Sequence, residues 1–484
     1  MSLPDSFADR SLAHPYQDAA VRRLRDLEYA GVFHEQGLGK TKIGLAIALH
    51  WLRESAVDAV LIVTKKMIVP TWLQEVRKHT ELVAVQLGPS LASAALSLTG
   101  PGRYFVTNYE QLPKLEDLLR RWIEARNVGV ILDESHAIKN PDRGVSTLLQ
   151  SLRSHFVRRL IMTGTPAANR PYDMWNQIRF LDGGATFGID YDTARREFDL
   201  PKTEAQSTGY ARRLEQLNAG LALFTSRETK ASAGLDLPPK YIHTWSAHLE
   251  PRQALLYADY AAEARVLVTQ SDMLTFDDTT PLLKRIGRLL ECVSNPSALD
   301  QSYGEQPGKD SVLLEVLARE IHGDKAILWT SYRANAERLR NVVGSNRSIV
   351  VHGGIGASSR LRRLERFSRS SSGPQLLIAT PASCKEGLTL TQATHVVYYD
   401  RSLSLDDYEQ SQDRIHRISQ TRTCHVHRII ALDTVDEWVD ILLDVKKAAA
   451  SVAQGDRAAD ARAVDWISHR QIFLQMLGQG GGSS

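Results

Sequence analysis

Cysteine is scarce in this sequence of 484 residues, which holds only Cys292, Cys384 and Cys424. The three lie far apart without paired-ligand spacing, so the sequence predicts neither a disulfide framework nor a structural zinc site. The run Cys424–His427, C-H-V-H, alternates like a strand, which directs the cysteine and the histidines to opposite faces. We expect an intracellular protein, cytoplasmic or nucleoid-associated if bacterial or viral and nuclear only if eukaryotic, with no disulfide-linked partner.

Long hydrophobic runs are also missing. No stretch approaches the roughly 20 apolar residues that span a bilayer, and the polar start over residues 1–10 does not resemble a signal peptide. Charge of one sign is missing too, because 59 lysines and arginines against 56 aspartates and glutamates leave a net charge of +3. We therefore expect no membrane partner, and any polyanion must be bound by a local basic patch.

The chain is too long for one hydrophobic core, and two or three domains are expected. Short runs rich in valine, isoleucine and leucine alternate with helical patterns in two series. The first series is Gly31–Phe33, Ala59–Thr64, Val83–Leu87, Tyr104–Thr107, Val128–Leu132 and Val157–Thr163, and the second is Ala326–Trp329, Ser348–Val351, Leu376–Thr380, His395–Tyr399 and His425–Ile430. Such strands predict an α/β fold with two parallel sheets, each covered by helices on both faces.

A glycine-rich turn joins the first strand of the first series to a helical stretch. Residues 33–41 read F-H-E-Q-G-L-G-K-T, with glycine at Gly37 and Gly39. Glycines allow positive φ and a close backbone approach, so that successive N–H groups and the helix N-terminus converge on an anion. Lys40 is expected to reach the β- and γ-phosphates of a nucleotide, and Thr41 is expected to bind Mg²⁺.

The match to the phosphate-loop pattern G-x-x-x-x-G-K-[ST] is incomplete, because His34 stands where the pattern has its first glycine. An ordinary strand-to-helix turn is therefore the alternative. A second feature favours the nucleotide: the apolar strand Val128–Leu132 ends in Asp133 and Glu134, where a parallel sheet places ligand chemistry. Asp133 is expected to hold Mg²⁺ and Glu134 to orient and deprotonate a water, against the alternative of an acidic surface turn.

Residues 133–140, D-E-S-H-A-I-K-N, resemble the Asp-Glu-x-His box of superfamily-two helicase-type motors in the form carried by the Swi/Snf group. Residues 34–41 resemble that group's Asp-Glu-Met-Gly-Leu-Gly-Lys-Thr, which lacks the same glycine, and Tyr16-Gln17 resembles its adenine-sensing motif. The resemblance implies two tandem RecA-like lobes with helical insertions, and ATP and Mg²⁺ as cofactors. It implies nucleotide contacts by Gln17, Gly37, Leu38, Gly39, Lys40 and Thr41.

Two further segments of the first lobe resemble the same group. Residues 162–166, M-T-G-T-P, are similar to the coupling motif, which implies that His136, Thr163 and Thr165 link the nucleotide to the track. Residues 107–110, T-N-Y-E, are similar to a strand-contact motif, which implies DNA contacts by Thr107 and Asn108.

The most informative run of the second lobe is Q-S-Q-D-R-I-H-R-I-S-Q, residues 410–420. Arg414 and Arg417 are three apart, so we expect one helical face with two guanidinium groups, against the alternative of a solvated basic face. The run resembles the family pattern Gln-x-x-Asp-Arg-x-x-Arg-Ile-Gly-Gln, with Ser419 in place of glycine. This implies that both arginines act as fingers and that Gln410 contacts the nucleotide.

Other segments of the second lobe resemble nucleotide and track contacts. Residues 385–390, K-E-G-L-T-L, are similar to the family's Glu-Gly-Leu-Asn-Leu, which implies a nucleotide contact at Gly387, while the family's Trp-Asn-Pro is replaced by R-S-L at 401–403. Residues 329–332 and 352–354 resemble strand-end motifs. The implied DNA contacts are Thr330, His352, Arg360 and Thr380.

Arginines recur in the stretch 360–369, at Arg360, Arg362, Arg363, Arg366 and Arg369. Such a cluster can neutralise phosphates. Leucine and phenylalanine interleave with the arginines, however, so part of the stretch is expected to be an amphipathic helix with a solvated side.

The expected domains follow from these patterns. Residues 1–236 form an N-terminal ATP-binding lobe with a helical insertion at about 182–226. Residues 237–308, opening with L-P-P-K, form a linker and a helical protrusion, and residues 309–447 form the second lobe. Residues 448–484 are expected to be a helix and a Gly/Ser-rich flexible tail.

The sequence thus predicts an ATP-driven motor that tracks along double-stranded DNA, with the nucleotide between its lobes and a protein partner as a source of specificity. Two alternatives stay open. One is an RNA or single-strand helicase of the wider superfamily. The other is a nucleotide-gated DNA clamp that hardly hydrolyses ATP.

Overall fold

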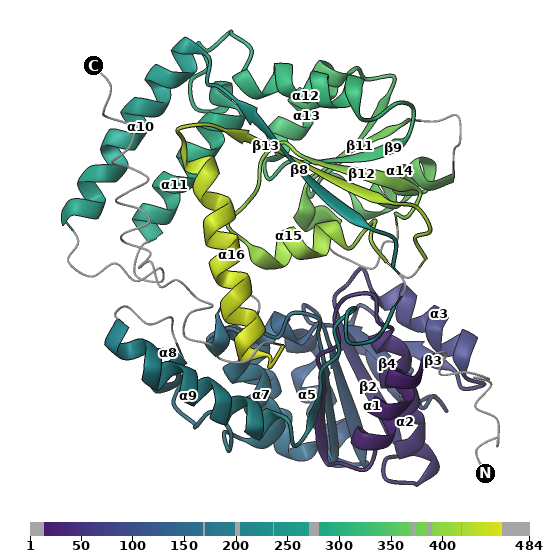
Figure 1. The fold of residues 1–484 in the computed structure, drawn as a ribbon. Coiled ribbons are helices and arrows are strands. Elements are labelled where there is room, and N and C mark those ends of the chain that lie inside the picture. Colours follow the sequence, from purple (N-terminus) through teal and green to yellow (C-terminus); the bar gives the residue numbers. More distant parts are fainter. Residues whose placement is uncertain are drawn as a thin grey trace. The chain divides into compact units, whose positions relative to one another are not determined.

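The computed structural model describes residues 14–167, 170–198, 204–235, 237–270, 280–369, 374–384, 390–417 and 419–456. They form two compact units: unit 1 holds the residues up to 235 together with 448–456, and unit 2 holds residues 237–447. Each unit is a parallel sheet with helices on both faces (Figure 1). The predicted pair of parallel α/β lobes is confirmed.

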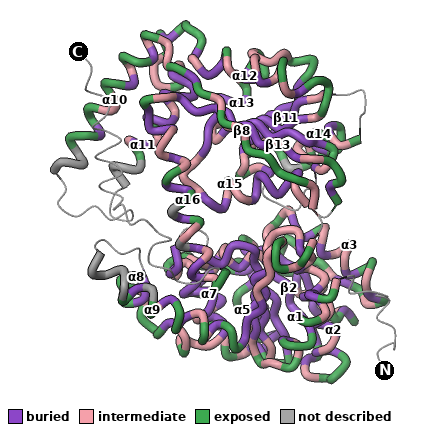
Figure 2. Tube along the Cα trace, viewed as in Figure 1, coloured by how far each residue is buried: buried purple, intermediate pink, exposed green. Residues whose placement is uncertain are grey.

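The sheet of unit 1 has seven parallel strands in the order β3-β4-β2-β5-β6-β1-β7. The central strands are apolar and buried on both faces, as the predicted helical cover requires (Figure 2). β7 lies inside the stretch predicted to be helical, and its two residues are too few to leave a periodic signal. The strands are β1 (Tyr29–Val32), β2 (Ala59–Thr64), β3 (Ala84–Gln86), β4 (Tyr104–Asn108), β5 (Val128–Asp133), β6 (Arg158–Met162) and β7 (Thr225–Ser226).

The helices of unit 1 lie on both faces of this sheet. On one face pack α1 (Pro15–Leu24), α2 (Lys40–Arg53) and α3 (Val69–His79). On the other face Phe105 of β4 meets Trp122 of α5 with ring centroids 5.0 Å apart. The remaining helices are α4 (Leu91–Thr99), α5 (Glu116–Glu124), α6 (Gly144–Leu152), α7 (Trp175–Asp182), α8 (Tyr191–Phe198) and α9 (Glu204–Leu221).

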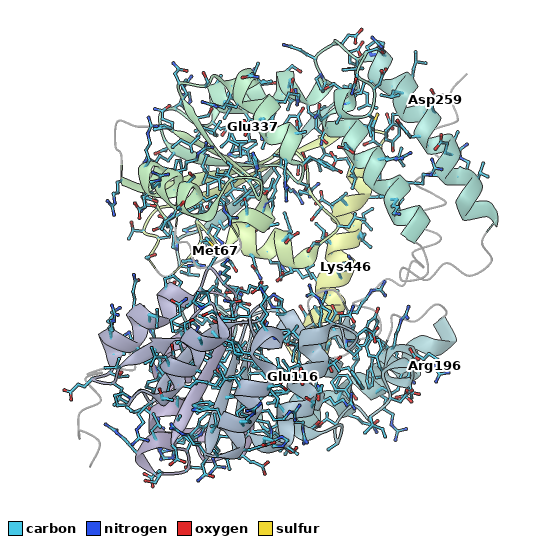
Figure 3. All side chains as sticks on the ribbon, turned by 180° about the vertical axis from the view of Figure 1, so that it is seen from behind. Met67, Glu116, Arg196, Asp259, Glu337 and Lys446 are labelled. Atoms are coloured by element: carbon cyan, nitrogen blue, oxygen red, sulfur yellow. The ribbon has the colours of Figure 1, made fainter. Side chains whose placement is uncertain are left out.

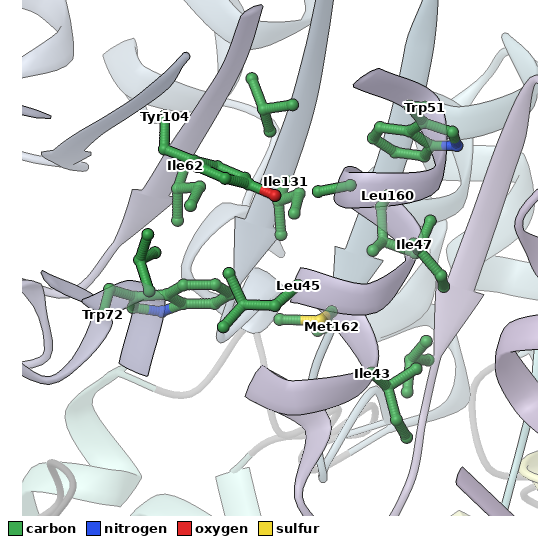
Figure 4. Packing of buried hydrophobic residues seen from close by; sticks show 14 of the residues in the cluster. Ile43, Leu45, Ile47, Trp51, Ile62, Trp72, Tyr104, Ile131, Leu160 and Met162 are labelled. Atoms are coloured by element: carbon green, nitrogen blue, oxygen red, sulfur yellow. The ribbon is translucent and has the colours of Figure 1, made fainter. Parts of the chain in front are cut away.

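The core under α2 and α3 reaches the carboxyl edge of the sheet. Figure 4 shows Trp72 of α3 beside Leu45 of α2 and Ile62 of β2, and all three are fully buried. A large indole here fills the space between two helices and the sheet, and its one polar atom needs a partner. That partner is Asp133, the last residue of β5.

The sheet of unit 2 has six parallel strands in the order β10-β11-β9-β12-β13-β8. The edge strand β8 was not predicted, since its exposed outer residues mask the strand pattern and prolines precede it. It pairs with β13 along its whole length, from Lys240–Cys424 to Ala247–Ala431. The strands are β8 (Lys240–Ala247), β9 (Lys325–Trp329), β10 (Ser348–Val351), β11 (Leu376–Ala379), β12 (Ala393–Tyr398) and β13 (Cys424–Ala431).

Helices cover both faces of this second sheet. On one face lie α12 (Gly308–Arg319) and α13 (Arg333–Val343), and on the other α14 (Ala357–Arg369) and α15 (Leu405–Gln412). The long helices α10 (Pro251–Gln270) and α11 (Thr280–Ser294) pack against each other. α16 (Val435–Ala453) follows β13. Of the helix predicted for 448–464, residues after 456 lie outside the described ranges, and none of the described helices is long and apolar enough for a bilayer crossing.

Four histidines form two diagonal hydrogen-bonded pairs on the α12 face of strands β12, β13 and β8. His395 Nδ1 lies 3.1 Å from His427 Nε2, and His243 Nε2 lies 3.1 Å from His425 Nδ1. Trp245 Nε1 donates to His427 Nδ1 at 3.2 Å, so His427 carries its proton on Nε2 and donates it to His395. Burial, followed by the neighbouring histidines, lowers the pKa of His427 to about 3.

The opposite face of β13 carries Cys424 and Val426, which are buried in the core under α14 and α15. The predicted alternation of this strand is therefore confirmed. Among the described residues no group of three or more histidine, cysteine or acidic side chains is arranged to hold a metal ion. In the structure, the four histidines of this face are hydrogen-bonded to one another in two pairs.

Candidate nucleotide site

The phosphate loop joins β1 to α2 in unit 1. Gly37 has φ +88° and Gly39, which caps α2, has φ +74°. Both conformations favour glycine, and they turn the backbone so that the N-terminus of the 14-residue α2 opens toward the loop. The positive φ predicted for the two glycines is confirmed, and the anion site at this loop stays a prediction.

Lys40 lies at the start of α2 with its ammonium turned back onto the loop. Its Nζ donates hydrogen bonds to the carbonyl oxygens of His34 at 2.9 Å and Glu35 at 3.3 Å. The side chain is 8% exposed, so these bonds hold the charge within the loop. An ammonium here is placed to meet phosphate oxygens bound in the cradle.

Gln17 of α1 contacts the same loop. Its Nε2 donates to the carbonyl of Leu38 at 3.0 Å, and the hydroxyl of Tyr16 donates to that carbonyl at 3.2 Å. A Cβ on Gly39 would lie 2.4 Å from Gln17 Nε2. Glycine at position 39 is thus favoured by its positive φ, and any other residue would also have to displace the side-chain amide of Gln17.

His34, the departure from the strict phosphate-loop pattern, is fully buried. Its Nε2 lies 2.9 Å from the hydroxyl oxygen of Ser226 in β7. Burial lowers the pKa of His34 to about 3, and the charges of Lys40 and Arg227 act in the same direction. His34 is therefore a neutral residue that ties the loop to the sheet edge.

Arg227, which follows β7, joins three segments of unit 1. Its guanidinium donates to the carbonyl of Phe33 and, at 3.2 Å, to that of Gly164, and it pairs with Asp456 at 2.7 and 2.9 Å. The start of the phosphate loop and the predicted coupling segment thus share one cation. Nothing in the local sequence around Arg227 indicates this role, because its partners are distant in the chain.

Asp133 ends β5, and each of its two side-chain oxygens accepts at least one hydrogen bond. Thr64 and Trp72 donate to Oδ2 at 2.9 and 2.8 Å, and the backbone N–H of Glu134 donates to Oδ1 at 3.0 Å. Burial, and then the charge of Glu134, raise the pKa of Asp133 to about 6, while the donors and Lys40 oppose this rise. The position of the carboxylate is fixed from the side of the core.

The oxygen atoms at this edge of the sheet are suitable ligands for Mg²⁺. Asp133 Oδ2 already has two donors, while Oδ1 accepts the backbone N–H of Glu134 and retains a lone pair for a metal-bound water. Thr41 lies in the first turn of α2 and supplies a hydroxyl. Carboxylate, hydroxyl and phosphate oxygens are the ligands that Mg²⁺ prefers, so the residues present fit this ion.

Glu134 follows Asp133 in a left-handed conformation, with φ +51°, which is unusual for a residue with a side chain. Gln36 of the phosphate loop donates to Glu134 Oε1 at 3.4 Å. Strained backbone of this kind recurs at functional sites, where the surrounding contacts hold it in place. The conformation directs Glu134 toward the loop instead of along the strand.

His136 connects Glu134 to the coupling segment. Its Nδ1 lies 3.1 Å from Thr163 Oγ1 and 3.3 Å from Glu134 Oε2. The Thr163 hydroxyl also accepts the backbone N–H of Thr165 at 3.2 Å. The three residues predicted for coupling are therefore joined to one another and to the predicted catalytic glutamate.

Sequence reasoning missed four residues of this network, namely Gln36, Thr64, Lys65 and Trp72. Thr64 and Lys65 lie at the end of β2, which pairs with β5 in the sheet, and Lys65 Nζ lies 3.0 Å from His136 Nε2. Strand order places them beside the box, and strand order is not readable from a single sequence. The one available signal was Trp72, because a buried indole in an amphipathic helix needs a hydrogen-bond acceptor.

In unit 2 the arginine run departs from its predicted geometry. α15 ends at Gln412, so Arg414 and Arg417 do not share a helical face. Ile415 is buried in the core, and Gln420 binds its carbonyl at 3.1 Å, which draws the chain into a turn. Arg414 is buried, and Arg417 is half-buried with Nε donating to the Asp413 carbonyl at 2.7 Å.

Gln410 and Gly387 are the two other predicted nucleotide contacts of unit 2. Gln410 lies on α15 and donates to Asp406 Oδ1 at 2.6 Å. Gly387 lies outside the described residues, as does the rest of the segment 385–389. The described part of unit 2 thus places Gln410 one turn before the arginine run.

Three predicted DNA-contact residues follow neighbouring strands of unit 2. His352, Thr380 and Thr330 come directly after β10, β11 and β9, which are adjacent and parallel. Thr330 is fully buried and donates to Asp400 Oδ2 at 2.6 Å, and its predicted contact with DNA stays a prediction. His352 Nε2 lies 2.9 Å from Glu337, which Figure 3 labels on α13.

In unit 1, Thr107 and Asn108 end β4 and are nearly buried. The Asn108 side chain accepts the backbone N–H of Gln111 at 3.1 Å, and Thr107 donates to the Gln111 side chain at 3.4 Å. Both side chains therefore shape the turn after β4. The DNA contact predicted for Thr107 and Asn108 stays a prediction.

The arginine-rich stretch of unit 2 forms α14. Leu364 and Phe367 are buried in the core, while Arg362, Arg363, Arg366 and Arg369 are exposed and Arg360 is half-buried. The predicted amphipathic helix is thus confirmed. Its outer face is the largest run of exposed cations on one described helix of unit 2.

Comparison with known proteins identifies the family. The model described as SNF2-related domain matches residues 16–298, and the helicase conserved C-terminal domain matches residues 308–419. The chain is 25% identical to the putative ATP-dependent helicase/translocase YwqA of Bacillus subtilis, over 90% of this chain and 48% of that protein. It is 24% identical to the DNA annealing helicase and endonuclease ZRANB3 of Mus musculus, over 98% of this chain and 43% of that protein.

A solved structure, the SWI2/SNF2 ATPase core of Sulfolobus solfataricus in complex with dsDNA, is 21% identical with a TM-score of 0.43, over 97% of this chain and 100% of that chain. The chain spans about half the length of these two curated relatives. Its family model covers more than half of the sequence, and the loop, the Asp-Glu-x-His box and the coupling segment lie where that match runs. The chain belongs to the SNF2-related family.

Proposed function

We propose that this chain is an ATP-dependent translocase on double-stranded DNA, which couples ATP hydrolysis to tracking or remodelling of the duplex. Family membership supports the proposal, as do relatives whose names describe an ATP-dependent helicase/translocase and a DNA annealing helicase. The site of action is the interior of the cell, where ATP and DNA occur together. A protein partner is the proposed source of any further specificity.

One observation carries the proposal: His136 contacts both Glu134 and Thr163. A nucleotide-binding clamp needs the phosphate loop but no base that is tied to a second segment. A motor needs the catalytic carboxylate to respond to whatever moves the coupling segment. The contact pair of His136 is the arrangement that such a response requires.

Each predicted nucleotide-site residue of unit 1 has a proposed part in hydrolysis. Lys40 and the backbone N–H groups of Gly37 to Gly39 bind the phosphates, and Gln17 contacts the adenine. Asp133 and Thr41 would hold Mg²⁺, which when bound neutralises charge on the phosphates. Glu134 orients the attacking water and accepts its proton.

Unit 2 contributes Gln410, Gly387 and the two arginines to the same proposed reaction. Arg414 and Arg417 are proposed to stabilise the charge of the transferring phosphoryl group, an effect worth about 10³ to 10⁵ in rate in related motors and switches. Hydrolysis then depends on unit 2 as well as on unit 1. A change in the grip of either unit on DNA during the cycle would convert hydrolysis into movement.

The DNA contacts proposed for unit 2 are the exposed cations of α14 and the strand ends at His352 and Thr380, together with Arg360. Unit 1 is proposed to contribute the turn after β4, at Thr107 and Asn108. Phosphate contacts of this kind carry no base specificity and weaken with salt, which suits a motor that moves over any sequence.

Two assays test the proposal. ATP turnover is measured alone and with duplex DNA, single-stranded DNA and RNA, and duplex DNA is expected to stimulate most, with the effect falling as salt rises. Displacement of a third strand from a DNA triplex then reports tracking without strand separation. Stronger stimulation by RNA would favour a helicase of the wider superfamily, and turnover that no nucleic acid changes would favour the clamp.

A further inference from the structure

In unit 1, Lys65 lies between the predicted functional residues at the end of β4 and those at the end of β5. It directly follows β2, which pairs on one side with β4, so that Thr64 lies beside Asn108. On its other side β2 pairs with β5, where Val63 lies beside Leu132 and the chain continues to Asp133. The turn that holds Lys65 continues to Met67, which Figure 3 labels.

The ammonium of Lys65 binds a neutral partner. Its Nζ lies 3.0 Å from His136 Nε2, and a protonated lysine has only donors, so Nε2 is the acceptor. No carboxylate of the described ranges lies within ion-pair distance of Lys65, although the side chain is half-buried. A half-buried cation without a counter-ion is a ready site for an anion.

The bond from Lys65 fixes how His136 meets Glu134. Because Nε2 accepts, the ring proton resides on Nδ1, 3.1 Å from Thr163 Oγ1 and 3.3 Å from Glu134 Oε2. The ring is thus held from both edges. Its N–H edge faces Glu134 Oε2.

We propose that Lys65 is a positioning residue that restrains Glu134 through His136 until a phosphodiester oxygen of the bound DNA strand takes over its ammonium. A phosphate competes well, because a hydrogen bond between two ions is stronger than one to a neutral imidazole. Once Lys65 turns to the phosphate, the His136 ring is released at Nε2 and Glu134 Oε2 is freed. The inference rests on the proposed function, since it explains why DNA would stimulate hydrolysis.

Two substitutions of Lys65 separate the restraint from the phosphate response. Lys65→Met has similar length and no donor, so it is expected to raise the DNA-free kcat about tenfold, the worth of one hydrogen bond to a charged group, with KM for ATP unchanged. Lys65→Gln keeps a donor for His136 but no charge for phosphate. It is expected to keep the low DNA-free kcat and to lose most of the stimulation by DNA.

Matched variants complete the experiment. Lys66→Met removes the same charge from the exposed neighbouring residue and is expected to leave the DNA-free kcat unchanged. Lys65→Arg retains charge and donors and is expected to restore most of the stimulation. Thermal unfolding of each full-length variant shows whether its fold is intact, and Lys65→Gln and Lys65→Arg test the inference if Lys65→Met unfolds.

The outcomes distinguish this inference from the proposed function. An unchanged DNA-free kcat in Lys65→Met with weaker DNA binding would reduce Lys65 to a phosphate contact, and a lower kcat would make it a support of the active geometry. Either result overturns the restraint. A wild-type protein whose turnover ignores DNA would instead refute the proposed function, while the DNA-free kcat of Lys65→Met still measures the restraint.

Discussion

Trp72 Nε1 donates a hydrogen bond of 2.8 Å to Asp133 Oδ2 from within the core of unit 1. The predicted Mg²⁺ residue is therefore oriented by an aromatic side chain that packs under α2 and the sheet. The bond makes the geometry of the metal residue depend on the packing of the core.

Trp72→Phe keeps most of the packing and removes this donor. Asp133 Oδ2 then retains Thr64 as its donor, so the free energy of unfolding is expected to fall by about 1–2 kcal/mol and the Mg²⁺ concentration for half-maximal turnover to rise several-fold. Turnover measured over a Mg²⁺ titration checks this. Trp122→Phe is the matched control, because the buried Trp122 Nε1 has no hydrogen-bond partner in the described structure. Equal Mg²⁺ requirements in the two variants would contradict the orienting role.

Lys40→Ala is expected to abolish ATP turnover while leaving the fold intact. The ammonium bonds carbonyls of the loop itself, so its loss removes the phosphate contact without disturbing the core. Turnover and circular dichroism are compared with those of Lys114→Ala, which removes an exposed lysine after β4. Turnover like that of the wild type would remove the phosphate-loop assignment.

Arg417→Ala is expected to keep ATP binding and to lose at least about 10³-fold in DNA-stimulated turnover, if this guanidinium stabilises the transferring phosphoryl group. Binding of a fluorescent ATP analogue and phosphate release are measured in parallel. Arg422→Ala, at a half-exposed arginine that pairs with Asp324 at 2.9 Å, is the control for charge alone. Surviving turnover in Arg417→Ala would exclude the finger role.

The buried histidines of unit 2 predict a pH-dependent stability. The pKa of His427 is lowered to about 3 in the folded chain, against an ordinary value near 6.5. Between these two pH values the unfolded chain therefore binds a proton at His427 that the folded chain does not. Stability is therefore lost as pH falls from 6.5 toward 3, by up to about 1.4 kcal/mol per pH unit for this one group. Above pH 6.5 the group is neutral in both states and contributes no slope.

Denaturant unfolding of the full chain at several pH values measures this slope. His427→Gln is expected to flatten it, and the comparison with the wild type cancels the opposite contribution of Asp133, whose pKa is raised. The exposed His322→Gln serves as the control and should keep the wild-type slope. If His427→Gln left the pH dependence of the unfolding free energy unchanged, the burial of His427 would not govern acid stability.

The strands and the loop were predictable from the sequence for a physical reason. β2 and β10 have the predicted bounds, because short and continuous apolar runs are typical of parallel strands that are buried on both faces of a sheet. The loop needed glycine at positions 37 and 39, and both have the positive φ that the pattern implies. The residue types within each of these segments were therefore sufficient to predict its local structure.

Contacts between distant segments were not predictable in the same way. Lys65 and Trp72 meet the Asp-Glu-x-His box because β2 lies next to β5, an order set by the packing of the whole sheet. The helical spacing of Arg414 and Arg417 was misleading, since α15 ends at Gln412, before it reaches either arginine. β8 was missed because an edge strand keeps exposed residues that hide its period.

The ammonium of Lys40 lies at the mouth of its own loop, bonded to the carbonyls of His34 and Glu35. We therefore expect nucleotide binding to be an exchange, in which phosphate oxygens replace carbonyl oxygens of the loop as acceptors of the Lys40 ammonium. The measured affinity for ATP is then a difference between two sets of bonds. A side chain that weakens the internal set, without touching the nucleotide, is expected to tighten binding.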